Sequence, residues 1–260
     1  IAGTAEADMI LALGGSDTVF GGDGDDNALG GSGDDIVFGD AGSDRIFGDA
    51  GDDFISGGKG NDMIFGGDGN DRFVAEADDG NDSYFGGLPG VGAGVDTLDM
   101  SAIMANISAN LGGGQMDRGA VYSDDTGHDT LWNVANIITG AGDDIITASN
   151  AVNVIDGGNG NDIFRFETAT AANGDTISTF QPGDKIDLSG MDANADLAGI
   201  QNFSIVSGGF SGKGQLMVAQ ETQGDEIFTV VSGNVNGGDE ADFRINIKGA
   251  HDLNLSDFTL

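Results

Sequence analysis

The sequence contains no cysteine and only 2 prolines in 260 residues. Disulfide bonds are therefore excluded. A fold with a small hydrophobic core would need another internal cross-link, such as a metal ion. Basic residues are scarce too, because 9 lysines and arginines face 44 aspartates and glutamates, giving a net charge of −35. A surface of this charge repels phosphates, which excludes direct binding of nucleic acid. Direct binding of an acidic polysaccharide or of a membrane is disfavoured for the same reason.

Long hydrophobic runs are also missing. No apolar stretch approaches the roughly 20 residues of a membrane-spanning helix. No N-terminal signal peptide is recognisable, and the chain begins with Ile1 rather than methionine. We therefore expect a fragment that follows an upstream domain of the same polypeptide.

Glycine is abundant, and it is ordered into a nine-residue repeat. From Gly21 to Val74 the chain reads GGDGDDNAL, GGSGDDIVF, GDAGSDRIF, GDAGDDFIS, GGKGNDMIF and GGDGNDRFV. The sixth position is always aspartate, and further steps of nine towards the N-terminus reach Asp17 and Asp8. Two such units make one coil of a solenoid, so turns 18 residues apart should stack on the same edge. Positions in the repeat are numbered one to nine below.

The turn of this repeat has the chemistry of a calcium site. Calcium takes six to eight oxygens at ~2.3–2.6 Å, from carboxylates and main-chain carbonyls. Glycines at positions one, two and four permit φ > 0, so carbonyls can converge without a Cβ in the way. The aspartate at position six adds charge, and an ion between stacked turns would take oxygens from both. We predict several ions, roughly four to eight, as the only cofactor.

The predicted calcium ligands comprise the position-six aspartates, the turn glycines and two aspartates displaced by insertions. The nine-residue unit returns after residue 138, where Asn153 holds one sixth position and predicts a weaker site because it has no charge. The full predicted set is Asp8, Asp17, Gly21, Gly22, Gly24, Asp26, Gly30, Gly31, Gly33, Asp35, Gly39, Gly42, Asp44, Gly48, Gly51, Asp53, Gly57, Gly58, Gly60, Asp62, Gly66, Gly67, Gly69, Asp71, Asp82, Asp96, Gly140, Gly142, Asp144, Gly157, Gly158, Gly160 and Asp162.

Side chains alternate along a strand, so position eight should point inward and position nine outward. Position eight forms an apolar column: Ile10, Val19, Ala28, Val37, Ile46, Ile55, Ile64 and Phe73. Position nine is unexpectedly apolar, with Phe20, Phe38, Phe47 and Phe65. These rings either form an outer aromatic ladder or are covered by another domain or by the C-terminal part. Trp132 is expected in the core.

The pattern predicts an all-β fold, a right-handed parallel β-roll with a C-terminal antiparallel β cap. Residues 1–98 form the N-terminal roll, and residues 99–138 an irregular, strand-rich connection that continues it. Residues 139–166 form a second short roll. Residues 167–260 form the cap and secretion region, because DTISTF, GQLMVA, IFTVVSG and ADFRINIKG are typical of short strands separated by turns.

The nonapeptide resembles the calcium-binding repeat of the RTX family. Beyond it, DTLWNVANIITGAGDDIIT, NVIDGGNGNDIFRF and DTISTFQPGDKIDLSGMDA resemble C-terminal modules of serralysin-type proteases and mannuronan epimerases. The resemblance implies export by a type I secretion machinery, directed by an uncleaved C-terminal signal, and folding outside the cell when calcium binds. It places the protein outside a bacterium, secreted or on the cell surface. The family often has aspartate where Thr179 stands, and its GD-NGDG-ADF turn appears in this sequence as GNVNGGDEADF, with Asn234 and an extra residue. We therefore expect structural roles for Asp175, Asp187 and Asp242.

No catalytic site is expected in this segment. HExxH and GxSxG are absent, and the two histidines, His128 and His251, occur in GHDT and GAHD turns. Paired carboxylates occur throughout and discriminate nothing. The leading hypothesis is a calcium-folded secretion and stabilisation module of a larger secreted protein. The alternatives are a free-standing structural or adhesive exoprotein and a polysaccharide-binding module, which would need a basic or aromatic groove.

Overall fold

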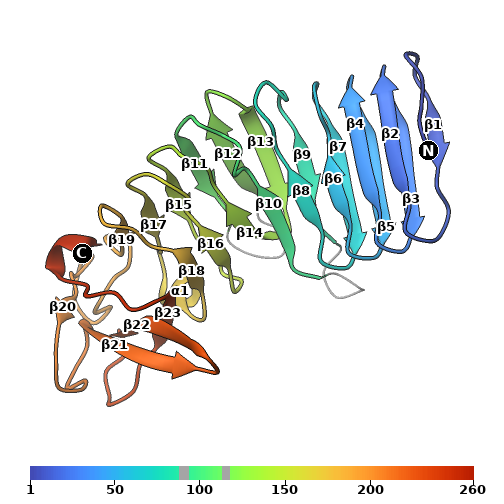
Figure 1. The fold of residues 1–260 in the computed structure, drawn as a ribbon. Coiled ribbons are helices and arrows are strands. Elements are labelled where there is room, and N and C mark those ends of the chain that lie inside the picture. The colour runs from blue at the N-terminus through green and yellow to red at the C-terminus, as the bar shows by residue number, and fades with distance from the viewer. Residues whose placement is uncertain (88–93, 113–117) are drawn as a thin grey trace. The chain divides into compact units, whose positions relative to one another are not determined.

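The computed structural model describes residues 1–87, 94–112 and 118–260, which divide into two compact units, Ile1–Gly142 and Asp143–Leu260. Strands dominate both units (Figure 1). In the described residues, helix is limited to one turn, α1 (Ala169–Ala172), and to a 3-10 turn, η1 (Leu255–Asp257). The prediction of an all-β fold is therefore confirmed.

The first unit begins as two parallel sheets between which the chain alternates (Figure 1). Each residue pairs with the residue 18 positions further on, as Ile46 does with Ile64. The long strands run from position seven of one repeat to position three of the next, and the residues of positions four to six form the turns between them. One sheet has the order β1 (Met9–Leu11), β3 (Asn27–Ser32), β5 (Arg45–Ala50), β7 (Met63–Asp68) and β9 (Ser83–Phe85). The other has the order β2 (Thr18–Asp23), β4 (Ile36–Ala41), β6 (Phe54–Ser56), β8 (Arg72–Val74) and β10 (Asp96–Asp99).

An antiparallel excursion interrupts this coiling and then rejoins it. Strands β11 (Ile107–Asn110), β12 (Gly119–Ser123) and β13 (Gly127–Trp132) form an antiparallel meander. Strand β13 also pairs in parallel with β9, and β14 (Val134–Ile138) pairs in parallel with β10. The chain therefore returns to the roll after the excursion.

The second unit continues in parallel strands past the last glycine repeat. One sheet has β15 (Ile145–Thr147), β17 (Ile163–Arg165), β19 (Lys185–Asp187) and β24 (Phe258–Thr259), all parallel. In the other, β16 (Val154–Asp156), β18 (Thr176–Thr179) and β23 (Phe243–Lys248) are parallel. Strands β22 (Glu226–Asn234) and β21 (Gln215–Gln223) add an antiparallel part, with β20 (Ser204–Ile205) at its edge. The antiparallel cap thus consists of β21, β22 and β23, and parallel pairing reaches beyond residue 166.

The core of the roll is a single column of position-eight side chains, as predicted. Val19, Val37, Ile46, Ile55 and Ile64 are all 0% exposed. Tyr84 and Leu98 extend the column where the repeat has lost its regular spacing. A core one side chain thick buries little apolar surface, so the sheets alone gain limited stability from it.

Position nine forms an aromatic ladder on the outer face of one sheet. The rings of Phe47, Phe65, Phe85 and Trp132 are stacked, with centroids 4.8, 4.6 and 4.4 Å apart. Arg118 lies over the far ring, 4.6 Å from its centroid. The core position predicted for Trp132 is wrong, because β13 pairs Trp132 with Phe85 and turns the neighbouring Leu131 inward. The rings cover one another's faces, which accounts for their partial burial.

A substitution in the inner column should cost far more than one on the outer face. Ile55→Ala removes a fully buried side chain and should lower the free energy of unfolding by about 2–5 kcal/mol. Met63→Ala, at a position 37% exposed, should change it by about 0.5 kcal/mol or less. Urea unfolding in saturating calcium measures both, and equal shifts would contradict the assignment of the core.

Candidate metal centre

The position-six aspartates of the first unit stack into two rows, one along each edge, which we call the aspartate rails. In each rail the main-chain N–H of one aspartate donates to Oδ1 of the aspartate in the next coil. The first rail, with N···O distances of 2.7–2.9 Å, runs through Asp8, Asp26, Asp44, Asp62, Asp82 and Asp129. The second, at 2.7–3.0 Å, runs through Asp17, Asp35, Asp53, Asp71 and Asp96.

The other carboxylate oxygen is left without a partner along most of both rails. These buried Oδ2 atoms accept no hydrogen bond in Asp17, Asp26, Asp35, Asp44, Asp53, Asp62, Asp71 and Asp129. A buried carboxylate oxygen without a partner is costly unless a cation or a donor compensates it. An unpaired, buried Oδ2 atom recurs in every regular coil, so it is a regular structural feature of the rails. The unpaired oxygens are available to a cation.

The turn glycines hold main-chain oxygens close to these carboxylates. A Cβ on Gly39 would lie 2.5 Å from Oδ2 of Asp44, and the same relation recurs at position one of the other repeats. A Cβ on Gly33, at position four, would lie 2.6 Å from the carbonyl oxygen of Gly15 in the preceding coil. Carboxylate and carbonyl oxygens thus crowd into the space that side chains would otherwise fill.

At position two the backbone adopts the left-handed conformation even in turns that have aspartate in place of glycine. Asp40, Asp49 and Asp78 stand there with φ of 70°, 74° and 62°, in the left-handed region. Aspartate tolerates this region better than most residues, at some cost. Among the described residues, no three aspartate, glutamate or histidine side chains converge as a ready-made metal site. Main-chain carbonyls would therefore have to complete a coordination shell, and calcium accepts such a mixed oxygen set.

The charge state of the rails is unfavourable without a cation. Burial raises the pKa of Asp44 and Asp53 from 3.8 to about 7, and neighbouring rail carboxylates add to the rise. Burial also raises the pKa of Asp82 to about 8, with the charge of Asp62 contributing. The donated main-chain N–H acts in the opposite direction at each of these carboxyls. At neutral pH the metal-free rails therefore favour partial protonation.

The second unit repeats this arrangement at irregular spacing, and the name aspartate rails includes its stacked aspartates. The N–H groups of Asp144 and Asp162 donate to Oδ1 of Asp162 and Asp184, both at 2.9 Å. Asn153 donates in the same way to Asp175, whose Oδ2 is unpaired, as is that of Asp162. Asp175 therefore has the geometry of a rail aspartate, and its expected structural role stays a prediction.

Sequence spacing missed Asp129, Asp175 and Asp184 because steps of 47, 22 and 22 residues separate them from their rail partners. A local signal was available. Each follows a turn glycine closely and precedes an inward apolar residue by two positions, as Asp129 precedes Leu131. The predicted ligands Asp82 and Asp96 share this signal, and both stand in a rail.

The remaining candidates have other surroundings. Asp187 pairs with Arg165 at 2.9 Å, and Asp242 accepts hydrogen bonds from the N–H groups of Val235 and Asn236. Both aspartates therefore serve local structure, as expected. Gly140 and Gly142 lie against the main chain of residues 103–106. Their assignment as ligands stays a prediction.

The two histidines are each engaged locally. His128 is exposed and packs edge-on against Tyr122, with ring centroids 4.2 Å apart. A ring nitrogen of His251 lies 2.8 Å from the carbonyl oxygen of Lys248.

The geometry defines a parallel β-roll with carboxylate rails, and comparison with known families specifies it further. The RTX calcium-binding nonapeptide repeat matches residues 2–37 and 38–73. The family described as peptidase M10 serralysin C terminal matches residues 91–260, more than half of the sequence. The chain belongs to this serralysin C-terminal family and carries calcium-binding RTX repeats in front of that region.

Comparison with curated proteins gave no match. Among solved structures, the chain is similar to the extracellular lipase LipA from Serratia marcescens, at 13% identity and a TM-score of 0.24. The match covers 83% of this chain and 40% of the lipase, so the chain spans less than half of that protein's length. No helix among the described residues has the length and apolarity needed to cross a membrane.

The raised pKa values predict an unusual pH dependence for the chelated chain. Folded carboxyls with pKa of about 7, such as Asp44 and Asp53, bind protons more tightly than at their ordinary pKa of 3.8. Between these two values the folded state binds more protons, so stability of the metal-free chain rises as pH falls from 8 to 5. Calcium affinity should fall over the same range, because protons compete for the rails. Far-UV circular dichroism of the chain in chelator at both pH values tests this, because protonation should restore part of the β-signal at pH 5, and a stronger β-signal at pH 8 would contradict it.

Proposed function

We propose that this chain is a calcium-dependent folding module that supports type I secretion and stabilises a larger secreted protein. The observation that carries the proposal is the row of buried, unpaired Oδ2 atoms along both rails. The turn glycines and position-six aspartates predicted from the sequence are the proposed ligands, for roughly four to eight ions. Bound calcium would supply the positive charge that the rails lack.

The same residues account for opposite behaviour inside and outside the cell. With 44 acidic and 9 basic residues, the metal-free chain repels itself and should stay expanded. An expanded chain suits passage through a narrow export channel. Outside, at calcium concentrations that match the ~10⁻⁴–10⁻³ M dissociation constants of extracellular modules, the rails would be neutralised and the coils could stack.

The segment itself is proposed to be non-catalytic, with any activity in an upstream domain of the same polypeptide. The two matched families describe a repeat and a C-terminal domain, which supports this division. Secretion to the medium or to the cell surface follows from the same proposal. The remaining partners are the components of the export machinery.

Export can be tested by placing a reporter domain in front of residues 1–260. In bacteria that express a serralysin-type exporter, the fusion should accumulate in the medium, and the reporter alone should remain in the cells. The fusion without the exporter provides the matched control. Retention of the fusion in the presence of the exporter would contradict the proposed role in secretion.

A further inference from the structure

Two turns outside the regular repeat stack on each other although 47 residues separate them. Residues 77–82 read ADDGND and residues 124–129 read DDTGHD. The N–H of Asp78 donates to the carbonyl oxygen of Asp125 at 2.8 Å, and the N–H of His128 donates to Oδ1 of Asn81 at 2.8 Å. The first contact joins position two of the two turns, and the second joins position five. Asp79 and Thr126, which both stand at position three, therefore stack on each other.

Position three is unusual in this pair of turns. In the regular repeats this position is exposed at Asp23, Ser32, Lys59 and Asp68 and half-buried at Ala41 and Ala50. Asp79 is only 2% exposed and Thr126 only 1%. A loop covers the second turn, since the N–H groups of Met104 and Ala105 donate to Asp125.

Three oxygens of this turn pair are buried without a partner. Oδ2 of Asp79 accepts the N–H of Glu76 at 2.7 Å, but its Oδ1 accepts nothing. Oγ1 of Thr126 and Oδ2 of Asp129 likewise lack a hydrogen bond of acceptable geometry, although the Thr126 hydroxyl is close enough to the Asp129 carboxyl to act against the rise of its pKa. Among the described residues, Asp79 and Thr126 are the only ones outside the rails with such a buried side-chain atom. The rail aspartate of the first turn, Asp82, is different, because its Oδ2 accepts the hydroxyl of Tyr84 at 3.1 Å.

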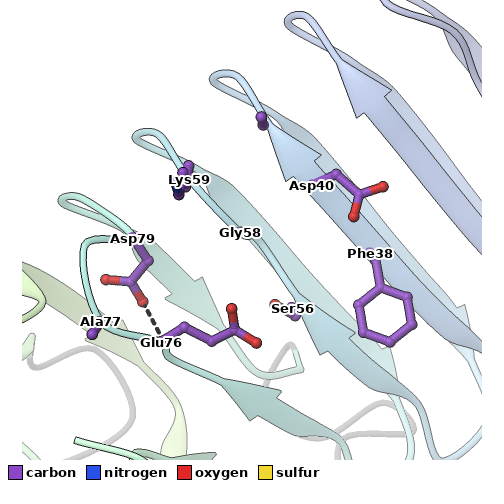
Figure 2. A pocket seen from close by; sticks show the side chains of 9 residues that line it. Phe38, Asp40, Ser56, Gly58, Lys59, Glu76, Ala77 and Asp79 are labelled. Atoms are coloured by element: carbon purple, nitrogen blue, oxygen red, sulfur yellow. Dashed lines mark hydrogen bonds between the residues drawn. The ribbon is translucent and has the colours of Figure 1, made fainter.

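A cavity borders the turn pair on the side of Asp79, and neither Thr126 nor Asp129 lines it. Its volume is about 380 Å³, and Asp79 lines it together with Asp40, Lys59 and Glu76. Figure 2 shows the carboxylate of Asp79 at one end of this cavity, hydrogen-bonded to Glu76. Its three carboxyl groups outnumber the single lysine, so the lining favours cations over anions.

We propose that turns 77–82 and 124–129 form a calcium site of a second kind, in which the side chains of Asp79 and Thr126 join Asp129 as ligands. The proposal rests on the proposed function, because it assumes that stacked turns of this chain bind calcium. Two carboxylates and a hydroxyl, completed by carbonyls, are hard oxygen ligands of the type calcium takes. A bound ion would hold strand β13 against the roll at the point where the chain returns to it. It would thereby also stabilise the antiparallel excursion between the two turns.

The test compares two aspartates at the same repeat position. Asp79→Asn keeps an oxygen for the N–H of Glu76 but removes the charge, and should reduce bound calcium by one ion per chain in equilibrium dialysis. Asp68→Asn, at an exposed position three, should leave the count unchanged. Thr126→Val, which preserves shape, should weaken one site about tenfold. Circular dichroism in saturating calcium checks that each variant is folded.

Terbium luminescence gives a local readout, because the buried Tyr84 lies beside the site and can sensitise a bound lanthanide. Tyr84→Phe should reduce this emission, and Asp79→Asn should reduce the emission and remove one ion. If Asp79→Asn does not fold, the calcium affinity of Thr126→Val and the terbium emission of the unmodified chain test the site instead. An unchanged count and emission in a folded Asp79→Asn variant would overturn this site alone. Absence of calcium binding by the unmodified chain would overturn the proposed function itself.

Discussion

Removal of calcium should abolish most of the β-structure of this chain. At ten times the dissociation constant each site contributes about 1.4 kcal/mol, so five sites contribute roughly 7 kcal/mol. That sum is comparable to the whole stability of an ordinary domain. The core offers little to replace it, because it is a single column of side chains such as Val37, Ile46 and Ile55.

Chelation would also leave the rail carboxylates buried and mutually repelling. Far-UV circular dichroism and the hydrodynamic radius, measured in EDTA and in millimolar calcium, test the expectation. Magnesium is the matched control, because its small octahedral shell suits these mixed oxygen turns poorly. It should restore much less structure than calcium does. A chelated chain that kept its β-signal and compactness would contradict the account.

The second large effect is expected from Gly60→Ala. Gly60 has a φ of 144°, and a Cβ there would collide with the carbonyl oxygen of Gly42 in the preceding coil. Its N–H also donates to the carbonyl oxygen of Asp79 at 2.6 Å in the following coil. The added methyl group must therefore separate three stacked turns. We expect a loss of at least about 3 kcal/mol and of the ions held between those turns.

Gly15→Ala is the matched control for this substitution. Gly15 also has φ in the left-handed range, at 112°, but nothing lies within 4 Å of the Cβ position. It therefore carries the conformational cost of alanine without the collision, expected at about 1 kcal/mol. Calcium titrations followed by circular dichroism should show a large rise in the midpoint for Gly60→Ala and a small one for Gly15→Ala. Equal shifts would mean that the close approach of stacked turns contributes nothing to calcium binding.

The regular part of the fold could be predicted because one period fixes several features at once. A step of 18 residues sets the strand register, the inward column at Ile46 and Ile64, and the stacking of Asp44 on Asp62. Rail positions could no longer be predicted where insertions changed the 18-residue step. Asp129 reaches its rail only because β13 pairs with β9 after an excursion of 47 residues, and that long-range pairing leaves no periodic trace.

The error at Trp132 has the same origin. A lone tryptophan in an irregular segment suggests burial, but strand pairing assigned the inward position to Leu131 and the outward position to Trp132. Stacking on Phe85 then shields the ring without a core. The aromatic ladder was recognisable only in the regular repeats, where the position-nine phenylalanines recur every nine or 18 residues.

The measurement that tests the central claim most directly is the location of the ions by anomalous diffraction from crystals grown in calcium. The account predicts anomalous peaks between successive turns along both rails. Each peak should lie ~2.3–2.6 Å from carboxylate oxygens that are otherwise unpaired, such as Oδ2 of Asp44 and Asp53. The same folded coils without peaks at these turns would contradict it.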